Sequence, residues 1–267
     1  MEEGFSFYIE PRLRKYLDEK VRDDLGKKDK DYVILIDGYE GSGKSTFAQQ
    51  IGYYVDPTLS LDRICMTADE FKDAVANSQK NQCVIYDEAV TGMTAGDSIS
   101  RVGKLLKSMM MQMRQKNLLV IIIMPVIFEF SKYAVLSRAK SFFHVFESKG
   151  RRGYFVGFNK RDMKKTYLQG KKTHSYTVMS KFKGRFYGKY TVNEEAYRKK
   201  KSDALSLIDD EDKKDVKNLH RDKLIFMIYK HFKLTQEEME TLFNQYGVDL
   251  KRRSIGSILE KFGGKQA

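Results

Sequence analysis

The chain has few of the residues that mark disulfide-rich or zinc-binding proteins. Its 267 residues include no tryptophan, three prolines, two cysteines and four histidines. Cys65 and Cys83 lie in apolar segments without CxxC spacing, so we expect buried thiols in a reducing compartment. The histidines are scattered and show no zinc-ligand spacing. The sequence therefore predicts neither a disulfide framework nor a zinc site.

Long apolar runs are also missing. The longest, residues 118–128, is too short to span a bilayer and contains Pro125. The charged segment 1–17 lacks the apolar core of a signal peptide. We therefore expect a cytoplasmic protein, in the host cell if it is viral, with no membrane partner. The chain is long enough for one sizeable α/β core and a small second domain.

Residues 38–45, GYEGSGKS, match the phosphate-binding pattern GxxxxGK[ST]. A strand-like apolar segment precedes them and a helix-like segment follows, so the loop has the context that this motif requires. We expect backbone N–H groups to surround an anion, Lys44 to reach the β- and γ-phosphates of ATP, and Ser45 to hold Mg²⁺. The predicted nucleotide-binding residues are Gly38, Tyr39, Glu40, Gly41, Ser42, Gly43, Lys44, Ser45 and Thr46.

A second apolar run, residues 83–86, ends in Asp87-Glu88. Asp87 is predicted to hold Mg²⁺ through water, and Glu88 to polarise a water that attacks the γ-phosphate. The alternative is that Glu88 only begins a helix. The Asp-Glu pair favours hydrolysis over transfer to a small molecule. A small-molecule kinase remains a weaker alternative, since no arginine-bearing lid or acidic acceptor pocket is evident.

The net charge of +13 is concentrated in residues 151–200. That segment has fifteen Lys and Arg residues and three acidic residues, a net charge of +12. Basic residues alternate there with aromatic residues and glycine, as in KFKGRFYGKY. This pattern predicts a nucleic-acid surface, with Lys181, Lys183 and Arg185 as DNA contacts. The alternative is a solvated charged face.

Strand-like and helix-like segments alternate through about residue 150, which predicts an α/β fold with a mainly parallel central sheet. Residues 1–205 are predicted to form this P-loop domain, with 151–200 as a basic extension of antiparallel β-hairpins. Residues 206–218 are strongly charged and are predicted to be a linker.

Residues 219–267 predict a small helical domain of three helices. The second helix opens with a capping box in which Thr235 precedes Glu238 by three residues. The last two helices, joined by a short turn, predict a helix-turn-helix in which Lys251, Arg252 and Arg253 contact DNA. The alternative is a protein-interaction module.

The order of these motifs resembles the additional-strand P-loop ATPases, and among them the FtsK/HerA-like and zonular-occludens-toxin-like proteins of viruses and mobile elements. The resemblance covers about residues 30–160 and implies an ATP- and Mg²⁺-dependent ATPase that forms a homo-oligomeric ring and translocates or packages DNA. It allows other viral or replication proteins as partners. It also suggests Arg138, or else Arg114, as an arginine finger acting on a neighbour's nucleotide.

The sequence departs from that family at one position. Relatives place a polar sensor at the end of the strand that follows the Asp-Glu strand, where this chain has Ile123-Met124-Pro125. Either Gln112 or Asn117 supplies the sensor, or sensing of the γ-phosphate is weak. Weak sensing favours the alternative function, a slow ATP-dependent switch, loader or regulator of DNA transactions.

Overall fold

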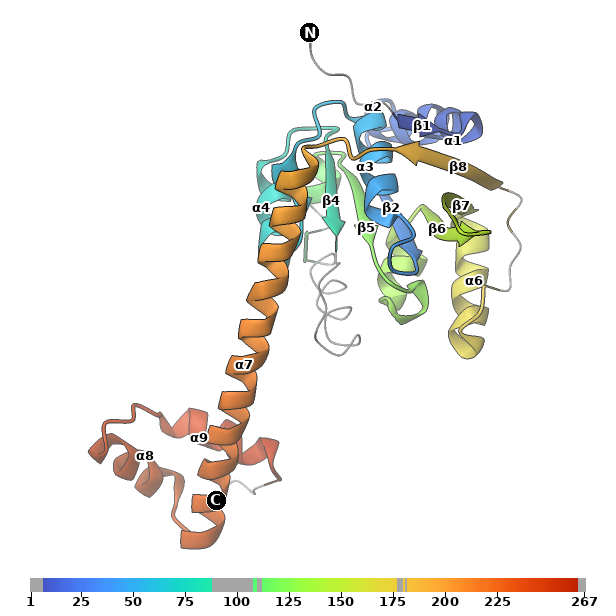
Figure 1. The fold of residues 1–267 in the computed structure, drawn as a ribbon. Coiled ribbons are helices and arrows are strands. Elements are labelled where there is room, and N and C mark those ends of the chain that lie inside the picture. Colours follow the sequence, from blue (N-terminus) through green and yellow to red (C-terminus); the bar gives the residue numbers. More distant parts are fainter. Residues whose placement is uncertain (1–6, 88–107, 110–111, 177–179, 181, 264–267) are drawn as a thin grey trace. The chain divides into compact units, whose positions relative to one another are not determined.

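The protein forms two compact units, Met1–Ser206 and Leu207–Ala267. The structure is a computed structural model that describes residues 7–87, 108–109, 112–176, 180 and 182–263, with backbone alone at 205 and 207–218. The first unit is a mixed α/β domain built on one sheet, and the second is helical (Figure 1).

An eight-stranded sheet organises the first unit, in the order β1-β8-β7-β6-β2-β5-β4-β3. Strands β6, β2, β5, β4 and β3 pair in parallel, and β7, β8 and β1 extend the sheet by antiparallel pairing. The strands are Phe7–Ile9 (β1), Tyr32–Gly38 (β2), Ile64–Cys65 (β3), Cys83–Asp87 (β4), Leu119–Ile123 (β5), Ser141–Ser148 (β6), Arg151–Asn159 (β7) and Phe182–Gly188 (β8).

The three central strands β2, β5 and β4 are buried along their whole length. Their sequences are apolar on both faces, which is typical of parallel strands covered by helices on both sides. Strand β5 lies between β2 and β4. Ile36 of β2 and Asp87 of β4 both pair with Ile123 of β5, so β4 and β5 end level at one edge and β2 continues to Gly38.

Helices cover both faces of this sheet (Figure 1). On one face, Val84 and Ile122 join Phe71 and Tyr167 in a buried cluster. On the other face, Phe47 stacks on Phe155, meets Phe143 edge to face and packs at a tilt against Phe186. The helical segments of this unit are Pro11–Tyr16 (α1), Leu17–Arg22 (η1), Asp23–Gly26 (α2), Lys44–Val55 (α3), Leu61–Arg63 (η2), Ala68–Asn77 (α4), Ile127–Glu129 (η3), Ala134–Arg138 (η4) and Lys160–Thr173 (α6).

The predicted antiparallel extension is present as β7 and β8, but two details beyond residue 150 differ from expectation. Helix α6, which was not expected, separates β7 from β8; Asn159 caps it, and Met163, Tyr167 and Gly170 form its buried stripe. The predicted linker, residues 206–218, begins where the chain divides into its two units, but it lies within one helix, Glu194–Phe232 (α7). Residues 194–232 contain no glycine or proline to end a helix.

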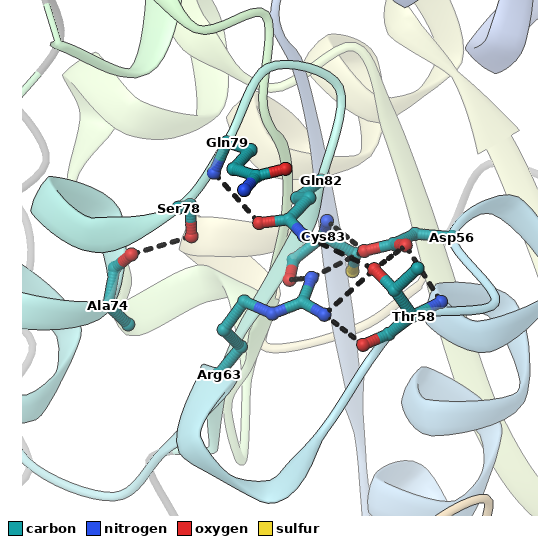
Figure 2. A network of polar contacts seen from close by, with 8 residues as sticks. All are labelled: Asp56, Thr58, Arg63, Ala74, Ser78, Gln79, Gln82 and Cys83. Carbon is teal, nitrogen blue, oxygen red and sulfur yellow. Dashed lines mark hydrogen bonds and ion pairs between the residues drawn. The ribbon is translucent and has the colours of Figure 1, made fainter.

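A buried polar network holds α3 against the start of β4 (Figure 2). Asp56, the residue after α3, accepts a hydrogen bond from the backbone N–H of Cys83 at 2.8 Å and pairs with Arg63 at 2.5 Å. Arg63 also donates to the carbonyl oxygens of Cys83 and Thr58. Since α3 follows the phosphate loop and β4 ends in Asp87, this network fixes the two elements that build the candidate site.

The second unit has its own apolar core, formed by Ile225, Met239, Ile255, Ile258 and Leu259. Helix α8 (Gln236–Gln245) begins with the capping box of Thr235 and Glu238, as predicted. Helix α9 (Arg252–Lys261) starts after residues 246–251, a longer connection than the three-residue turn expected from the sequence. Throughout the described part of the chain, the helices are too short or too polar to cross a membrane.

Candidate nucleotide-binding site

The loop 38–45 connects β2 to α3 and depends on two glycines. Gly38 has φ +144°, and a Cβ there would lie 2.0 Å from the carbonyl oxygen of Val145 on β6. Gly43 has φ +100° in the left-handed region and serves as the N-cap of α3. Side chains at either position would clash or strain the backbone, so glycine permits the tight return of the chain.

The loop presents positive charge at the start of α3. No side chain caps this helix N-terminus, and its N–H groups and dipole favour an anion. The ammonium of Lys44 donates to the carbonyl oxygens of Gly38 at 2.6 Å and Tyr39 at 2.9 Å. Burial lowers the pKa of Lys44, while the carboxylates of Asp87 and Asp37 act to raise it. These groups lie together in an arrangement suited to a phosphate chain.

A cavity of about 810 Å³ opens over the loop. Its walls come from residues 40–46, the ends of β4 and β5, the segment 186–190 that ends β8, and the start of α7. Five basic side chains line it against three acidic ones, which makes it attractive to an anion. The basic residues are Lys44, Arg152, Lys189, Arg198 and Lys201, and the acidic ones are Glu40, Asp87 and Glu194.

Asp87 ends β4 and is buried beside the loop. Its Oδ2 accepts a hydrogen bond from the Tyr197 hydroxyl at 2.5 Å and lies 3.8 Å from the Lys201 ammonium. Burial first, and then the Asp87 carboxylate, raise the pKa of the Tyr197 phenol. The other carboxylate oxygen, Oδ1, is buried without a hydrogen-bond partner among the described residues. A buried carboxylate oxygen in this condition is suited to a ligand.

The oxygens of Ser45 and Asp87 fit Mg²⁺. This ion takes one or two protein oxygens and completes its shell with water and phosphate oxygens. The described residues contain no group of three His, Cys, Asp or Glu that could hold a metal ion by itself. The oxygens of Ser45 and Asp87 suit a cation that also takes phosphate oxygens.

A second buried carboxylate, that of Asp37, anchors the start of the loop. Asp37, which precedes Gly38, accepts hydrogen bonds from the backbone N–H of Ile127 at 2.9 Å and the Tyr176 hydroxyl at 2.5 Å. Its other oxygen lies 2.8 Å from Nδ1 of His144. Both oxygens of Asp37 are engaged, so this residue anchors the loop rather than facing the cavity.

The structure brings together most of the residues predicted to bind nucleotide and metal. Glu40, Gly41, Ser42, Gly43, Lys44, Ser45, Thr46 and Asp87 line one cavity. Tyr39 is four-fifths exposed, and its side chain contributes no wall. The predicted base Glu88 and the predicted DNA contact Lys181 lie outside the described residues.

Arg138 is at the opposite edge of the sheet from the loop. Its guanidinium pairs with Asp31, the residue before β2, and both side chains are largely buried. An arginine finger must reach a nucleotide, so this pair gives the predicted role no support. Arg114, the second arginine considered, lies on the same short helical segment as Gln112 and is exposed.

Neither alternative for the sensor, Asn117 or Gln112, is placed at the phosphate loop. The side-chain amide of Asn117 donates to the carbonyl oxygen of Leu25 and to Asp29, just before β5 begins and away from the phosphate loop. Gln112 is exposed on the preceding helical segment. At the carboxyl end of β5, the cavity wall consists of Ile123, Met124 and Pro125.

Sequence reasoning missed the contribution of β7 and α7. Arg152 projects toward the loop, since its Nη2 lies 3.6 Å from where a Cβ of Gly41 would be. Arg198 and Lys201 line the cavity from the first turns of α7, and the buried Tyr197 of the same turns contacts Asp87. No local pattern marks these residues, because Tyr197 and Asp87 are 110 positions apart and only the fold joins them.

Comparisons with known proteins provide limited support. No family model and no curated protein matches the chain. One solved structure that it resembles is the N-terminal domain of zonular occludens toxin from Neisseria meningitidis, at 14% identity. The alignment covers 63% of this chain and 98% of that domain, with a TM-score of 0.34. A TM-score this low does not support an assignment of function, which therefore rests on the geometry of the site.

Proposed function

We propose that the protein binds ATP with Mg²⁺ in the cavity over loop 38–45 and hydrolyses it. One observation carries this proposal: the loop, Lys44 and the buried Asp87 line the same positively charged cavity. In this assignment Lys44 binds the β- and γ-phosphates, and Ser45 and Asp87 hold the ion. Mg²⁺, when bound, neutralises charge on the phosphate oxygens.

The proposed chemistry assigns the base role to Glu88, as the sequence predicts. A positioned carboxylate takes the proton from the attacking water and contributes about 10²- to 10⁴-fold to the rate. Lys44, Arg152 and Lys201 supply positive charge around the reacting phosphates. The apolar wall at Ile123 and Met124 excludes water from one side of the site but offers no sensor.

Two variants should distinguish nucleotide binding from ATP turnover. Lys44→Ala should weaken binding of a fluorescent ATP analogue by at least about tenfold, since a charge-assisted contact is lost. Glu88→Gln should bind the analogue normally yet lower turnover by about 100-fold or more. Lys72→Ala, a change at an exposed lysine paired with Asp69, is the matched control. Normal hydrolysis by Glu88→Gln would refute the base assignment.

We further propose that the ATPase acts on DNA, as an oligomeric translocation or packaging enzyme of a virus or mobile element. The support is a basic face on the antiparallel end of the sheet, formed by Arg152 and Tyr154 of β7 with Lys183, Arg185 and Tyr187 of β8. The Arg185 guanidinium lies 4.9 Å from the centre of the Tyr154 ring, and Tyr187 stacks on Tyr8. Exposed cations beside aromatic rings suit a phosphate backbone and bases.

The cations of this basic face have no ion-pair partner in the described part of the chain. Arg152, Lys183 and Arg185 form no ion pair with the described acidic residues, unlike Lys27 and Lys28 just after α2 and Lys72 of α4. In the second unit, by contrast, Lys251 pairs with Asp249 and Arg252 with Glu237, although all four side chains are exposed. The basic face of the first unit is therefore the stronger DNA candidate, and contacts by Lys251, Arg252 and Arg253 remain a prediction.

ATP hydrolysis with and without DNA tests this second part. Turnover should rise with DNA, and the rise should weaken at higher salt. Reversing charge at Lys183 and Arg185 should weaken DNA binding and reduce the salt slope by about one per lost phosphate contact. Lys72→Glu with Lys80→Glu is the control, because both lysines are exposed and paired. Separate single- and double-stranded DNA identify the substrate.

The apolar wall favours a second candidate, a slow ATP-dependent switch or loader. Ile123, Met124 and Pro125 occupy the place where relatives carry a polar sensor, so γ-phosphate binding would be coupled weakly to turnover. Slow hydrolysis that is indifferent to DNA, together with ATP-dependent DNA binding, would support the switch. Strong stimulation by DNA would support the motor.

A further inference from the structure

Tyr197 contacts Asp87, one of the two residues that are proposed to hold Mg²⁺. It lies in the first turns of α7, is 1% exposed, and donates its hydroxyl proton to Oδ2 of Asp87 at 2.5 Å. A tyrosine that is remote in sequence therefore contacts the carboxylate that ends β4.

This contact divides the roles of the two Asp87 oxygens. Oδ2 accepts the hydrogen bond from Tyr197, whereas Oδ1 is buried and has no hydrogen-bond partner among the described residues. A carboxylate with both oxygens free can rotate about its last bond. One strong hydrogen bond removes that freedom and leaves the other oxygen in a fixed direction. Outer hydrogen bonds of this kind orient the ligands of metal sites.

Neighbouring side chains hold the Tyr197 ring itself in place. Tyr190 packs on it with ring centres 4.8 Å apart, and the Lys201 ammonium lies 5.9 Å from the ring centre. Lys200, also on α7, donates to the carbonyl oxygens of Leu61 and Ile64, which ties this helix to the segment that leads into β3. These contacts restrict rotation of the Tyr197 side chain and keep its hydroxyl directed at Asp87.

We propose that Tyr197 is a positioning residue for the metal site, which fixes Asp87 so that Oδ1 faces the nucleotide-bound Mg²⁺. The inference rests on the proposed ATP site and adds to it a residue outside the two phosphate-binding motifs. It predicts that loss of the hydroxyl affects the Mg²⁺-dependent part of nucleotide binding. The phosphate contacts of loop 38–45 do not pass through Tyr197 and should persist without Mg²⁺.

The test is a Mg²⁺ titration of the full chain, with binding of a fluorescent ATP analogue as the readout. In Tyr197→Phe, the Mg²⁺ concentration at the midpoint should rise by about 10- to 100-fold. Binding in EDTA should match that of the unaltered protein. Tyr167→Phe is the matched control: this tyrosine is also 1% exposed and donates to the carbonyl oxygen of Phe130, away from the cavity.

Each outcome is decisive. An unchanged midpoint in Tyr197→Phe, or an equal loss of binding with and without Mg²⁺, would overturn the inference while leaving the ATP site intact. An equal rise in the midpoint for Tyr167→Phe would also overturn it, because the effect would then be one of packing. If the unaltered protein binds no nucleotide in either condition, the proposed function itself fails. In an Asp87→Asn background, Tyr197→Phe should have no further effect on the Mg²⁺ dependence.

Discussion

The two edges of the parallel sheet differ in how fully their buried carboxylates are paired. At the amino edge, where the strands begin, each buried carboxylate meets a cation directly: Asp31 pairs with Arg138 and Asp56 with Arg63. At the carboxyl edge, Lys44 donates to backbone carbonyl oxygens and Asp87 keeps one oxygen unpartnered among the described residues.

This difference separates charges that are paired within the fold from charges in the proposed ligand site. A buried pair with all its hydrogen bonds made costs little, whereas a buried carboxylate oxygen without a partner costs free energy in the protein alone. Such a cost is typical of functional sites, where a ligand supplies the missing contact. The amino edge is therefore expected to carry stability, and the carboxyl edge binding.

The largest effect on stability is expected at the amino edge, from Asp56→Ala. It leaves the Arg63 guanidinium buried without its carboxylate, so the free energy of unfolding should fall by about 3–5 kcal/mol. Urea denaturation measures this change. Asp69→Ala, at an exposed residue, should change it by less than about 0.5 kcal/mol. Equal effects of the two variants would remove the contrast between the edges.

Arg138→Ala separates a structural role from a catalytic one. Removing the guanidinium leaves Asp31 largely buried without its ion pair, so we expect a loss of about 1–3 kcal/mol in unfolding free energy. ATP turnover per folded molecule should be unchanged. A protein of normal stability that no longer hydrolyses ATP would instead establish Arg138 as an arginine finger.

Acid should weaken the stabilisation that Asp56 gives to the amino edge. Burial acts to raise the pKa of Asp56, but hydrogen bonds from Thr58 and Cys83 and the charge of Arg63 together hold it below its ordinary value of 3.8. A folded-state pKa below the unfolded one stabilises the protein above the unfolded pKa, and this contribution is lost as the pH falls through the folded pKa. In Asp56→Asn, unfolding free energy measured from about pH 5 to pH 2 should depend less on pH.

The smallest effect on stability is expected at the carboxyl edge, from Asp87→Asn. The asparagine side-chain oxygen can still accept the Tyr197 hydrogen bond, and the desolvation cost of a buried charge disappears. Unfolding free energy should change by less than about 1 kcal/mol, while Mg²⁺-dependent nucleotide binding should be lost. A loss of several kcal/mol would mean that Asp87 is part of the structural framework.

Much of the central sheet could be predicted from local patterns. The apolar runs of β2, β4 and β5 and the glycines around Lys44 indicate strands and a phosphate loop by themselves, because their physics is local. Helix α6 and the continuity of α7 through the charged residues 206–218 were not predicted. The Asn159 cap and the stripe of Met163, Tyr167 and Gly170 are local signals of α6, but the many basic and aromatic residues around them also fit β-hairpins.

The sequence by itself determined the phosphate loop, its lysine and serine, and the carboxylate that ends β4, since each depends on backbone conformation and side chains a few residues apart. Only the tertiary structure decided what surrounds them. The fold brought Tyr197 and Lys201 to Asp87, and it carried Arg152 to the loop and Arg138 away from it. These contacts join residues distant in the chain, so they follow from strand order and helix packing rather than from any local pattern.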